Sequence, residues 1–284
     1  MFLGSPEAAV APLLALYQAG FDLALVVTQP DKRRGRGGVL SPSPVKAAAI
    51  DLGIPVSHRV DDVAATGADL GVVVAFGKLI KPPVLAAVPM VNMHFSLLPR
   101  WRGAAPVERA ILAGDAESGV CIMELEEGLD TGPVLARERV AIDSDTTADE
   151  LRAALAEVGT GLLLNQLEHG LSPGVAQEGE VTYAAKIEPA ELAMTWTNPA
   201  VQLDRLVRIG RAWTTFRGRR LGVARAVPIE GRDDLAPGQL DGVVVGTGDG
   251  ALELMEVHPE GRPAMDARSW VNGARPSLGE RLGG

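Results

Sequence analysis

The sequence predicts an α/β protein, with a mostly parallel sheet in its first part and a small all-β domain in its last part. Residues 23–28 and 72–75 are continuous apolar runs, which are typical of parallel strands buried on both faces. A helix pattern precedes the first run, so a strand–helix–strand unit is expected near the start of the chain. After residue 213, short stretches of alternating hydrophobicity are separated by glycine-containing turns, which favours antiparallel strands.

The first part should contain regular elements on either side of one long irregular segment. In order, we expect a very short strand at 2–4, a helix at 6–17, a strand at 23–28, a helix at 45–52, a short strand near 55 and a strand at 69–76. Residues 29–44 lack periodicity and are rich in glycine and proline, so they are predicted to form a long loop. Loops of that length in compact domains are commonly functional.

A strand at 90–95 is the centre of the predicted site. Polar residues occupy every second position, so Asn92 and His94 share one face about 7 Å apart. An amide and an imidazole at the carboxyl end of a strand indicate a site at the edge of an α/β sheet. Hydrogen-bonded packing residues would give the same pattern. Beyond this strand we expect a helix at 106–113, strands at 120–125 and 134–142, and a helix at 146–167.

The character of the sequence changes after residue 183. Residues 187–197 have the composition of a linker, and residues 199–212 form an amphipathic helix pattern. The strands that follow are expected to close into a small β-barrel of the oligonucleotide-binding (OB) type. These features divide the chain into a first domain at 1–187, a linker at 188–202 and a C-terminal domain at 203–284.

Composition excludes several classes of protein. A net charge of −9 argues against a general affinity for nucleic acids. Cys121 is the only cysteine, so an internal disulfide is excluded and a reducing cytoplasm is the expected compartment. Apolar runs are shorter than the roughly 18 residues of a membrane-spanning helix, and the first residues lack a secretory signal. Cysteine and histidine do not have metal-ligand spacing, so no metal is expected.

Cationic residues are nevertheless concentrated in two stretches of this acidic chain. The first stretch lies in the predicted loop and consists of Lys32, Arg33, Arg34 and Arg36. The second has no acidic residue among its arginines, which are Arg205, Arg208, Arg211, Arg217, Arg219, Arg220 and Arg225. Local patches of this kind fit a specific polyanion that docks at defined places. Solvated surface faces would have the same composition.

The strings NMHFSLLP (92–99) and LDTGP (129–133) resemble the folate-dependent formyltransferases, a family that uses an Asn–His–Asp constellation on a Rossmann-like domain. The longer string SLLPRWRGAAP (96–106), together with TQPD (28–31), GRG (35–37) and SPVK (43–46), is similar to the branch that formylates methionyl initiator tRNA. The resemblance covers nearly the whole chain, including the C-terminal β-domain. Phe95 and Phe76 depart from the residues common in relatives, and both are near the expected pterin pocket.

The resemblance implies a role for each motif. Asn92, His94 and Asp130 would be catalytic, with 10-formyltetrahydrofolate as the formyl donor. The folate would be bound by Ser96, Leu97, Leu98, Pro99, Phe76 and Gly77. The cations of the first stretch would bind the acceptor end of initiator methionyl-tRNA, and its body would be bound by Arg205, Arg208, Arg217, Arg219 and Arg220. The protein is expected to be a monomer that does not associate with membranes.

The chemistry of these residue types agrees with the resemblance. Formyl transfer to an amine passes through a tetrahedral oxyanion, which requires hydrogen-bond donors and a route for the amine proton. Asn92 can donate through its amide, and His94 can donate as an imidazolium favoured by Asp130. Asp130 can also relay the proton through water. A covalent enzyme intermediate is unnecessary, because the substrate amine is itself the nucleophile.

Two other interpretations remain open at this point. The same three side chains would serve a formyltransferase that acts on a glycinamide nucleotide or an amino-sugar nucleotide. The β-domain and the basic loop are less expected in an enzyme of that kind. A non-catalytic RNA- or folate-binding protein is the second alternative, and the presence of Asn92, His94 and Asp130 argues against it.

Overall fold

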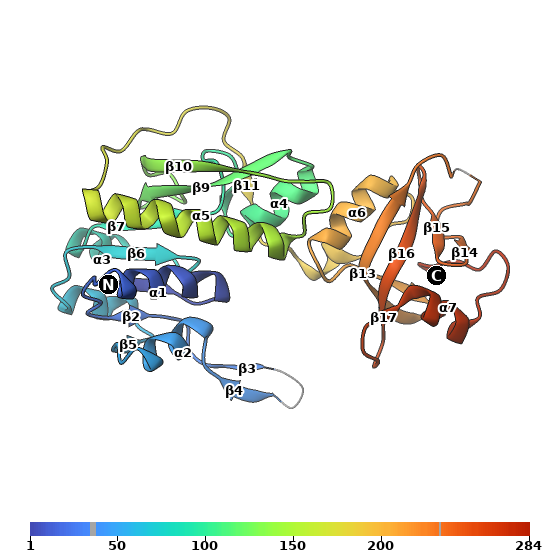
Figure 1. Cartoon of the computed structure of the whole chain (residues 1–284), viewed down its shortest axis with the longest axis horizontal. Helices are drawn as coiled ribbons and strands as arrows, with labels where there is room; N and C mark the ends of the chain where they lie inside the picture. Colours follow the sequence, from blue (N-terminus) through green and yellow to red (C-terminus); the bar gives the residue numbers. More distant parts are fainter. Residues whose placement is uncertain (35–37, 233) are drawn as a thin grey trace. The chain divides into compact units, whose positions relative to one another are not determined.

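The structure is a computed structural model that describes residues 1–34, 38–232 and 234–284. Arg36 and the side chain of Arg34, two of the predicted tRNA contacts, lie outside the described part. The chain forms two compact units (Figure 1). Unit 1 comprises Met1–Val107, Ala116–Ile142 and Glu150–Ala185. Unit 2 comprises Glu108–Asp115, Asp143–Asp149 and Lys186–Gly284.

Unit 1 is built on a seven-stranded sheet with the order β10-β9-β7-β6-β1-β2-β5. Its strands are β1 (Phe2–Gly4), β2 (Val26–Val27), β5 (Val56–Ser57), β6 (Gly71–Val74), β7 (Met90–His94), β9 (Glu117–Glu124) and β10 (Val134–Ala141). Neighbouring strands from β5 to β7 are parallel, and β9 and β10 are antiparallel additions at one edge. The prediction of a mostly parallel sheet is therefore confirmed. Strands β2 and β5 lie on one side of β1, and β6 and β7 lie on the other, so the strand order reverses at β1. In sheets of this kind, ligands bind at the carboxyl ends of the strands.

Helices cover both the first crossovers and the antiparallel edge. They are the 3-10 helices η1 (Glu7–Ala9) and η2 (Val60–Ala65), and the α-helices α1 (Val10–Gln18), α2 (Pro44–Asp51), α3 (Pro82–Ala87), α4 (Pro106–Ala113) and α5 (Ala148–His169). Ser43 begins α2, because its hydroxyl accepts the Lys46 N–H at 3.0 Å. Helix α5 lies directly on β7 and β9 (Figure 1), since a methyl group added at Gly159 would be 2.6 Å from Met93 Sδ. Leu3, Val27 and Val73, which belong to the parallel strands, pack together in one buried apolar cluster.

The predicted loop at 29–44 contains a β-hairpin instead. Strands β3 (Lys32–Arg34) and β4 (Val39–Ser41) pair antiparallel, with Arg33 opposite Leu40. The Arg33 guanidinium also donates to the Gly38 carbonyl at 2.9 Å. The loop prediction was wrong because Val39 and Leu40 are both exposed, at 67% and 63%, so no buried face imposes an alternating pattern on the sequence.

Unit 2 contains a six-stranded antiparallel sheet with the order β12-β13-β16-β15-β14, and β17 pairs with β16. The strands are β12 (Trp213–Phe216), β13 (Arg219–Ile229), β14 (Leu240–Asp241), β15 (Val244–Gly246), β16 (Ala251–Pro259) and β17 (Met265–Asp266). A short turn at 247–250 joins β15 to β16. Two helices, α6 (Ala200–Arg208) and α7 (Ala267–Ala274), accompany the sheet.

The segment before α6 is packed rather than extended away from the sheet. It includes the 3-10 helix η3 (Pro189–Leu192) and the buried Trp196, whose indole N–H donates to Thr214 Oγ1 at 2.9 Å. Helix α6 buries Leu203, Leu206 and Val207, the apolar face that the sequence predicts. In unit 1 the two-residue strands β8 (Arg102–Gly103) and β11 (Tyr183–Ala184) form a separate parallel pair. No helix in the described residues is long and apolar enough to cross a membrane.

Candidate active site

Strand β7 places Asn92 and His94 at the point where the parallel part of the sheet meets its antiparallel edge. Asn92 lies opposite Met123 of β9, and His94 lies opposite Cys121, so the two polar side chains share one face. Both are buried, with exposures of 8% and 6%. Among the described residues, no group hydrogen-bonds to the Asn92 side-chain amide. A buried amide that folding leaves without a protein partner is available to a ligand.

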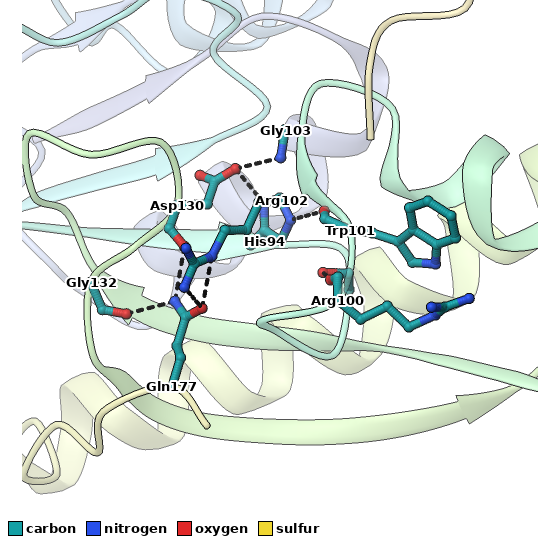
Figure 2. A network of polar contacts seen from close by, with 9 residues as sticks. His94, Arg100, Trp101, Arg102, Gly103, Asp130, Gly132 and Gln177 are labelled. Carbon is teal, nitrogen blue, oxygen red and sulfur yellow. Dashed lines mark hydrogen bonds and ion pairs between the residues drawn. The ribbon is translucent and has the colours of Figure 1, made fainter. Parts of the chain in front are cut away.

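The chain turns sharply after β7, and short hydrogen bonds hold that turn. Ser96 Oγ donates to the Arg100 carbonyl at 2.6 Å, and the Trp101 N–H donates to Thr182 Oγ1 at 2.9 Å. Trp101 has a left-handed backbone, with φ +61°, and its carbonyl oxygen faces His94. That oxygen lies 3.0 Å from His94 Nε2 (Figure 2). A carbonyl oxygen only accepts, so Nε2 carries the proton in this contact.

Asp130 completes the constellation from the turn between β9 and β10. Its Oδ2 is 3.6 Å from His94 Nδ1 and accepts the Gly103 N–H at 2.8 Å (Figure 2). The carboxylate is 12% exposed, so its interaction with the ring is only weakly screened by solvent. His94 and Asp130 therefore meet at the carboxyl end of β7, and Asn92 lies two positions earlier on the same face of the strand. A donor, an imidazole and a carboxylate at one place can stabilise an oxyanion and remove a proton from an amine.

The predicted folate-binding residues differ in their exposure. Ser96 and Leu98 are completely or almost completely buried, with exposures of 0% and 1%, and Leu98 packs in a cluster with Cys121. Leu97 is only half-buried. Phe76 is buried, and its carbonyl accepts from Gln29 Nε2 at 3.2 Å. Pro99 is buried and Gly77 is exposed. Leu97 and Gly77 are thus the members of this group with surface available for a ligand.

Cys121 lies opposite His94 on the neighbouring strand, but its side chain packs in a buried apolar cluster. It is fully buried, and burial raises the pKa of its thiol. A protonated thiol inside an apolar cluster is a poor nucleophile. Cys121 therefore contributes to packing in this cluster.

The second cationic stretch is divided between internal contacts and the surface. Arg208 pairs with the buried Asp204 at 2.9 Å and also donates to the Thr146 carbonyl at 3.0 Å. Burial raises the pKa of Asp204, and the neighbouring Arg208 opposes that rise. Arg205 is half-buried, with its guanidinium packed against Gly114.

Arg217 is also held by internal contacts. Its guanidinium pairs with Glu280 through Nε at 2.6 Å and donates to the Ala274 carbonyl at 3.2 Å. Arg219 and Arg220 are exposed, and the Arg220 guanidinium lies over the Trp213 ring at 4.5 Å. Lys32 and Arg33 of the hairpin are exposed in unit 1.

Two polar residues near Asp130 had no role in the sequence-based predictions. Gln177 donates to the carbonyls of Asp130 and Gly132 at 2.9 and 2.8 Å, and it accepts two bonds from Arg102 (Figure 2). Gln177 lies in a segment without periodicity, far from the motifs in sequence, so its position gives no signal of this contact. Arg102 lies within the SLLPRWRGAAP string, but nothing in that string assigns its partner.

Comparison with known proteins decides the family to which this arrangement belongs. Residues 1–167 match the model described as formyl transferase, and residues 186–275 match the formyl transferase C-terminal domain. The chain belongs to the formyl transferase family. Both parts of the predicted architecture are therefore confirmed for this formyl transferase, the Rossmann-like sheet domain and the separate β-domain.

Relatives of this formyl transferase match it along its whole length. The methionyl-tRNA formyltransferase of Symbiobacterium thermophilum is 45% identical, over 99% of this chain and 94% of that protein. The methionyl-tRNA formyltransferase of Streptomyces coelicolor is 43% identical, over 100% of this chain and 99% of the relative. The resemblance recognised in the sequence is confirmed by these matches.

Solved structures share the fold at lower identity. The N-formyltransferase of Helicobacter canadensis, crystallised with folinic acid and dTDP-3-aminofucose, has a TM-score of 0.69 at 16% identity, over 89% of this chain and 97% of that one. HypX of Aquifex aeolicus, in complex with tetrahydrofolic acid, has a TM-score of 0.61 at 19% identity, over 81% of this chain and 44% of that one. A folate-type formyl donor is thus consistent with the family and its structural neighbours.

Proposed function

We propose that this formyl transferase transfers the formyl group of 10-formyltetrahydrofolate to the α-amino group of methionyl initiator tRNA. The observation that carries the proposal is the contact of His94 with Asp130 at the carboxyl end of β7, with Asn92 on the same face of the strand and its amide unpaired among the described residues. Full-length relatives at 45% and 43% identity that bear the name methionyl-tRNA formyltransferase support the choice of acceptor. The reaction would take place in the cytoplasm, with the protein acting as a monomer.

The mechanism follows from the atoms that these residues present. The amine nitrogen attacks the formyl carbon, a C–N bond forms, and the formyl oxygen becomes an oxyanion. Asn92 donates its amide N–H to that oxygen, and the His94 ring lies on the same face of β7 beside Asp130. The amine loses a proton toward the His94–Asp130 pair. The carbon–nitrogen bond to N10 of the folate then breaks, and N10 takes up the proton that the His94–Asp130 pair received from the amine.

His94 is oriented for this work by the groups on its two sides. The Trp101 carbonyl holds Nε2 at 3.0 Å, whereas the 3.6 Å between Nδ1 and Asp130 Oδ2 exceeds hydrogen-bond length. Nδ1 is therefore the nitrogen that can exchange a proton with a substrate or a water molecule beside Asp130. We assign the proton route of the reaction to this side of the ring.

Binding of the two substrates is proposed from the surfaces that the residues retain. Ser96, Leu98, Pro99 and Phe76 shape the folate site from beneath, while Leu97 and Gly77 contact the folate itself. On the tRNA, Lys32, Arg33, Arg34 and Arg36 would bind the acceptor end through phosphates. Of the second stretch, we retain Arg219 and Arg220 as contacts of the tRNA body, because both are exposed.

One assay compares the candidate acceptors directly. The purified full-length chain is supplied with 10-formyltetrahydrofolate and either charged initiator tRNA, a glycinamide nucleotide or an amino-sugar nucleotide. We expect rapid formylation of the charged tRNA and little of the other amines. Preferential formylation of a small amine would replace the proposed acceptor, and binding of folate or tRNA without any turnover would show a non-catalytic protein.

A further inference from the structure

Asp130 has a backbone conformation that needs support from its surroundings. Its φ is +51°, in the left-handed region that residues with a side chain rarely adopt. The four residues before it, 126–129, are all exposed, so the turn receives little packing from that side. Contacts elsewhere must hold the carboxylate 3.6 Å from His94 Nδ1.

Gln177 supplies contacts of that kind through every polar atom of its side chain. Nε2 donates to the Asp130 carbonyl at 2.9 Å and to the Gly132 carbonyl at 2.8 Å. Oε1 accepts from Arg102 Nε at 3.0 Å and from Arg102 Nη2 at 2.6 Å. These four bonds use both amide protons and both lone pairs of the oxygen. Figure 2 shows the dashed lines that run from this amide to Asp130, Gly132 and Arg102.

Arg102 connects this amide to the other side of the catalytic pair. Its neighbour Gly103 donates the N–H that the Asp130 carboxylate accepts at 2.8 Å, and its other neighbour, Trp101, holds His94 Nε2. The Arg102 N–H itself donates to the Thr182 carbonyl at 2.9 Å. The carboxylate and carbonyl of Asp130 and the ring of His94 are thus all connected to the segment 101–103, the carbonyl through Gln177. A closed ring of contacts resists displacement better than any single hydrogen bond in it.

We propose that Gln177, oriented by Arg102, is a positioning residue that holds the Asp130 carboxylate against His94 for the proton transfer. This inference rests on the proposed function, in which that carboxylate takes part in turnover. Gln177 acts through the backbone of Asp130 and Gly132, so it affects the catalytic step without contributing to the binding of either substrate.

The two amide protons are essential to this role. Nε2 donates to two carbonyl oxygens. A carboxylate oxygen at the same place cannot donate a hydrogen bond, so it would leave both carbonyls facing another acceptor. A Gln177→Glu variant would keep the length of the side chain and could still pair with Arg102. It should nevertheless repel the turn that carries Asp130.

Turnover measurements on a small set of variants test the proposal. Gln177→Ala should lower kcat by about 10- to 100-fold, because displacement of a catalytic group by about 1 Å has an effect of that size. Gln177→Glu should lower kcat at least as much, and KM for charged tRNA should stay within about twofold in both. Gln18→Glu is the matched control, since Gln18 is exposed at the end of α1 and undergoes the same change of charge. The control should have unchanged kinetics.

A double-mutant cycle separates positioning from a general loss of structure. Single-turnover rates with excess enzyme are measured for Asp130→Ala, with and without Gln177→Ala. Because Gln177 acts through Asp130, its removal should have almost no further effect once the carboxylate is gone. An equal fold-reduction in both backgrounds would overturn the proposal, as would wild-type kcat in Gln177→Ala.

The outcomes also distinguish this inference from the proposed function. Wild-type turnover in Asp130→Ala would overturn the proposed mechanism itself, whereas an impaired Asp130→Ala beside a normal Gln177→Ala overturns only the positioning role. Circular dichroism establishes that each variant is folded. Should Gln177→Ala not fold, Arg102→Lys enters the same cycle, because it weakens the hydrogen bonds to the Gln177 amide and leaves the amide in place.

Discussion

Strand β7 and the arginines between 205 and 225 differ in how their polar side chains are used. Along β7, Asn92 and His94 share one face and meet a carboxylate from another turn. Along the arginine stretch, Arg208 and Arg217 are held by internal acidic partners, while Arg219 and Arg220 are exposed. The alternation of side chains along a strand predicts which residues share a face. In contrast, arginines that are close in sequence need not share a role.

The reason lies in what each pattern constrains. A strand buried on both faces leaves each side chain one direction, so a polar residue there must find a partner or serve a ligand. An arginine has a long side chain that can reach an acidic residue several positions away or in another element. Its role is therefore decided by which carboxylates the fold brings within reach.

The largest expected effect tests the β7 side of this comparison. His94→Ala and Asp130→Ala should each lower kcat by about 100-fold or more, because their interactions strengthen in the transition state. Asn92→Ala should behave similarly, and the Asn92–His94 double variant should be less than additive. Folate should still raise the Tm of each variant. Near-normal turnover in any single variant would contradict its assigned catalytic role.

The arginine side of the comparison is tested by two substitutions in the same stretch. Arg208→Ala should reduce the free energy of unfolding by about 3 kcal/mol, because it leaves the buried Asp204 carboxylate unpaired. Arg219→Ala should change it by less than about 0.5 kcal/mol, as expected of an exposed side chain. Denaturant titration measures both. Equal reductions in stability would remove the distinction between the two arginines.

The pH dependence of the Arg208→Ala variant sharpens the same point. Burial raises the pKa of Asp204 above its unfolded value, so its charge destabilises the folded state. Removal of Arg208 raises that pKa further. The stability penalty should therefore be greatest near neutral pH and should disappear below about pH 4, the unfolded pKa of an aspartate. A penalty that did not change with pH would mean that weaker packing, and not charge, is responsible.

The hairpin should have a smaller effect, confined to tRNA. Replacing Lys32, Arg33, Arg34 and Arg36 with alanine should raise KM for charged tRNA by about tenfold and flatten its salt dependence. The slope should change by about 0.7 to 0.9 for each phosphate that the variant no longer neutralises. Folate affinity and kcat at saturating tRNA should not change. The same kinetics as wild type at every salt concentration would leave these residues as solvated surface.

The smallest expected effect concerns Glu280. Its ion pair with Arg217 and the Ser277 N–H lower the pKa of Glu280 to about 2. A lowered pKa stabilises the folded state above the unfolded value near 4.5, and this stabilisation is lost as the pH falls toward 2. Glu280→Gln should therefore unfold more readily than wild type at neutral pH and approach it in acid. Parallel pH profiles for the two proteins would show that the pair adds nothing measurable.

Much of the architecture was predictable because it depends on local patterns. Continuous apolar runs identified the parallel strands, alternation identified the β7 face, and the predicted bounds of α4 agree with the structure. The hairpin at 32–41 was missed because its strands have no buried face, and hydrophobic alternation is the signal that reveals a strand.

The sequence alone predicted which residues would carry the chemistry: an amide and an imidazole two positions apart on a buried strand, with a carboxylate in a later turn. Tertiary structure alone decided the contacts of the Asp130 turn, because Gln177 reaches that turn from a distant part of the chain and is itself hydrogen-bonded by Arg102. It also decided that Arg208 and Arg217 form ion pairs with acidic residues within unit 2. Hydrogen bonds between residues far apart in sequence depend on packing that no short-range periodicity records, whereas a strand's alternation is set by the geometry of its own backbone.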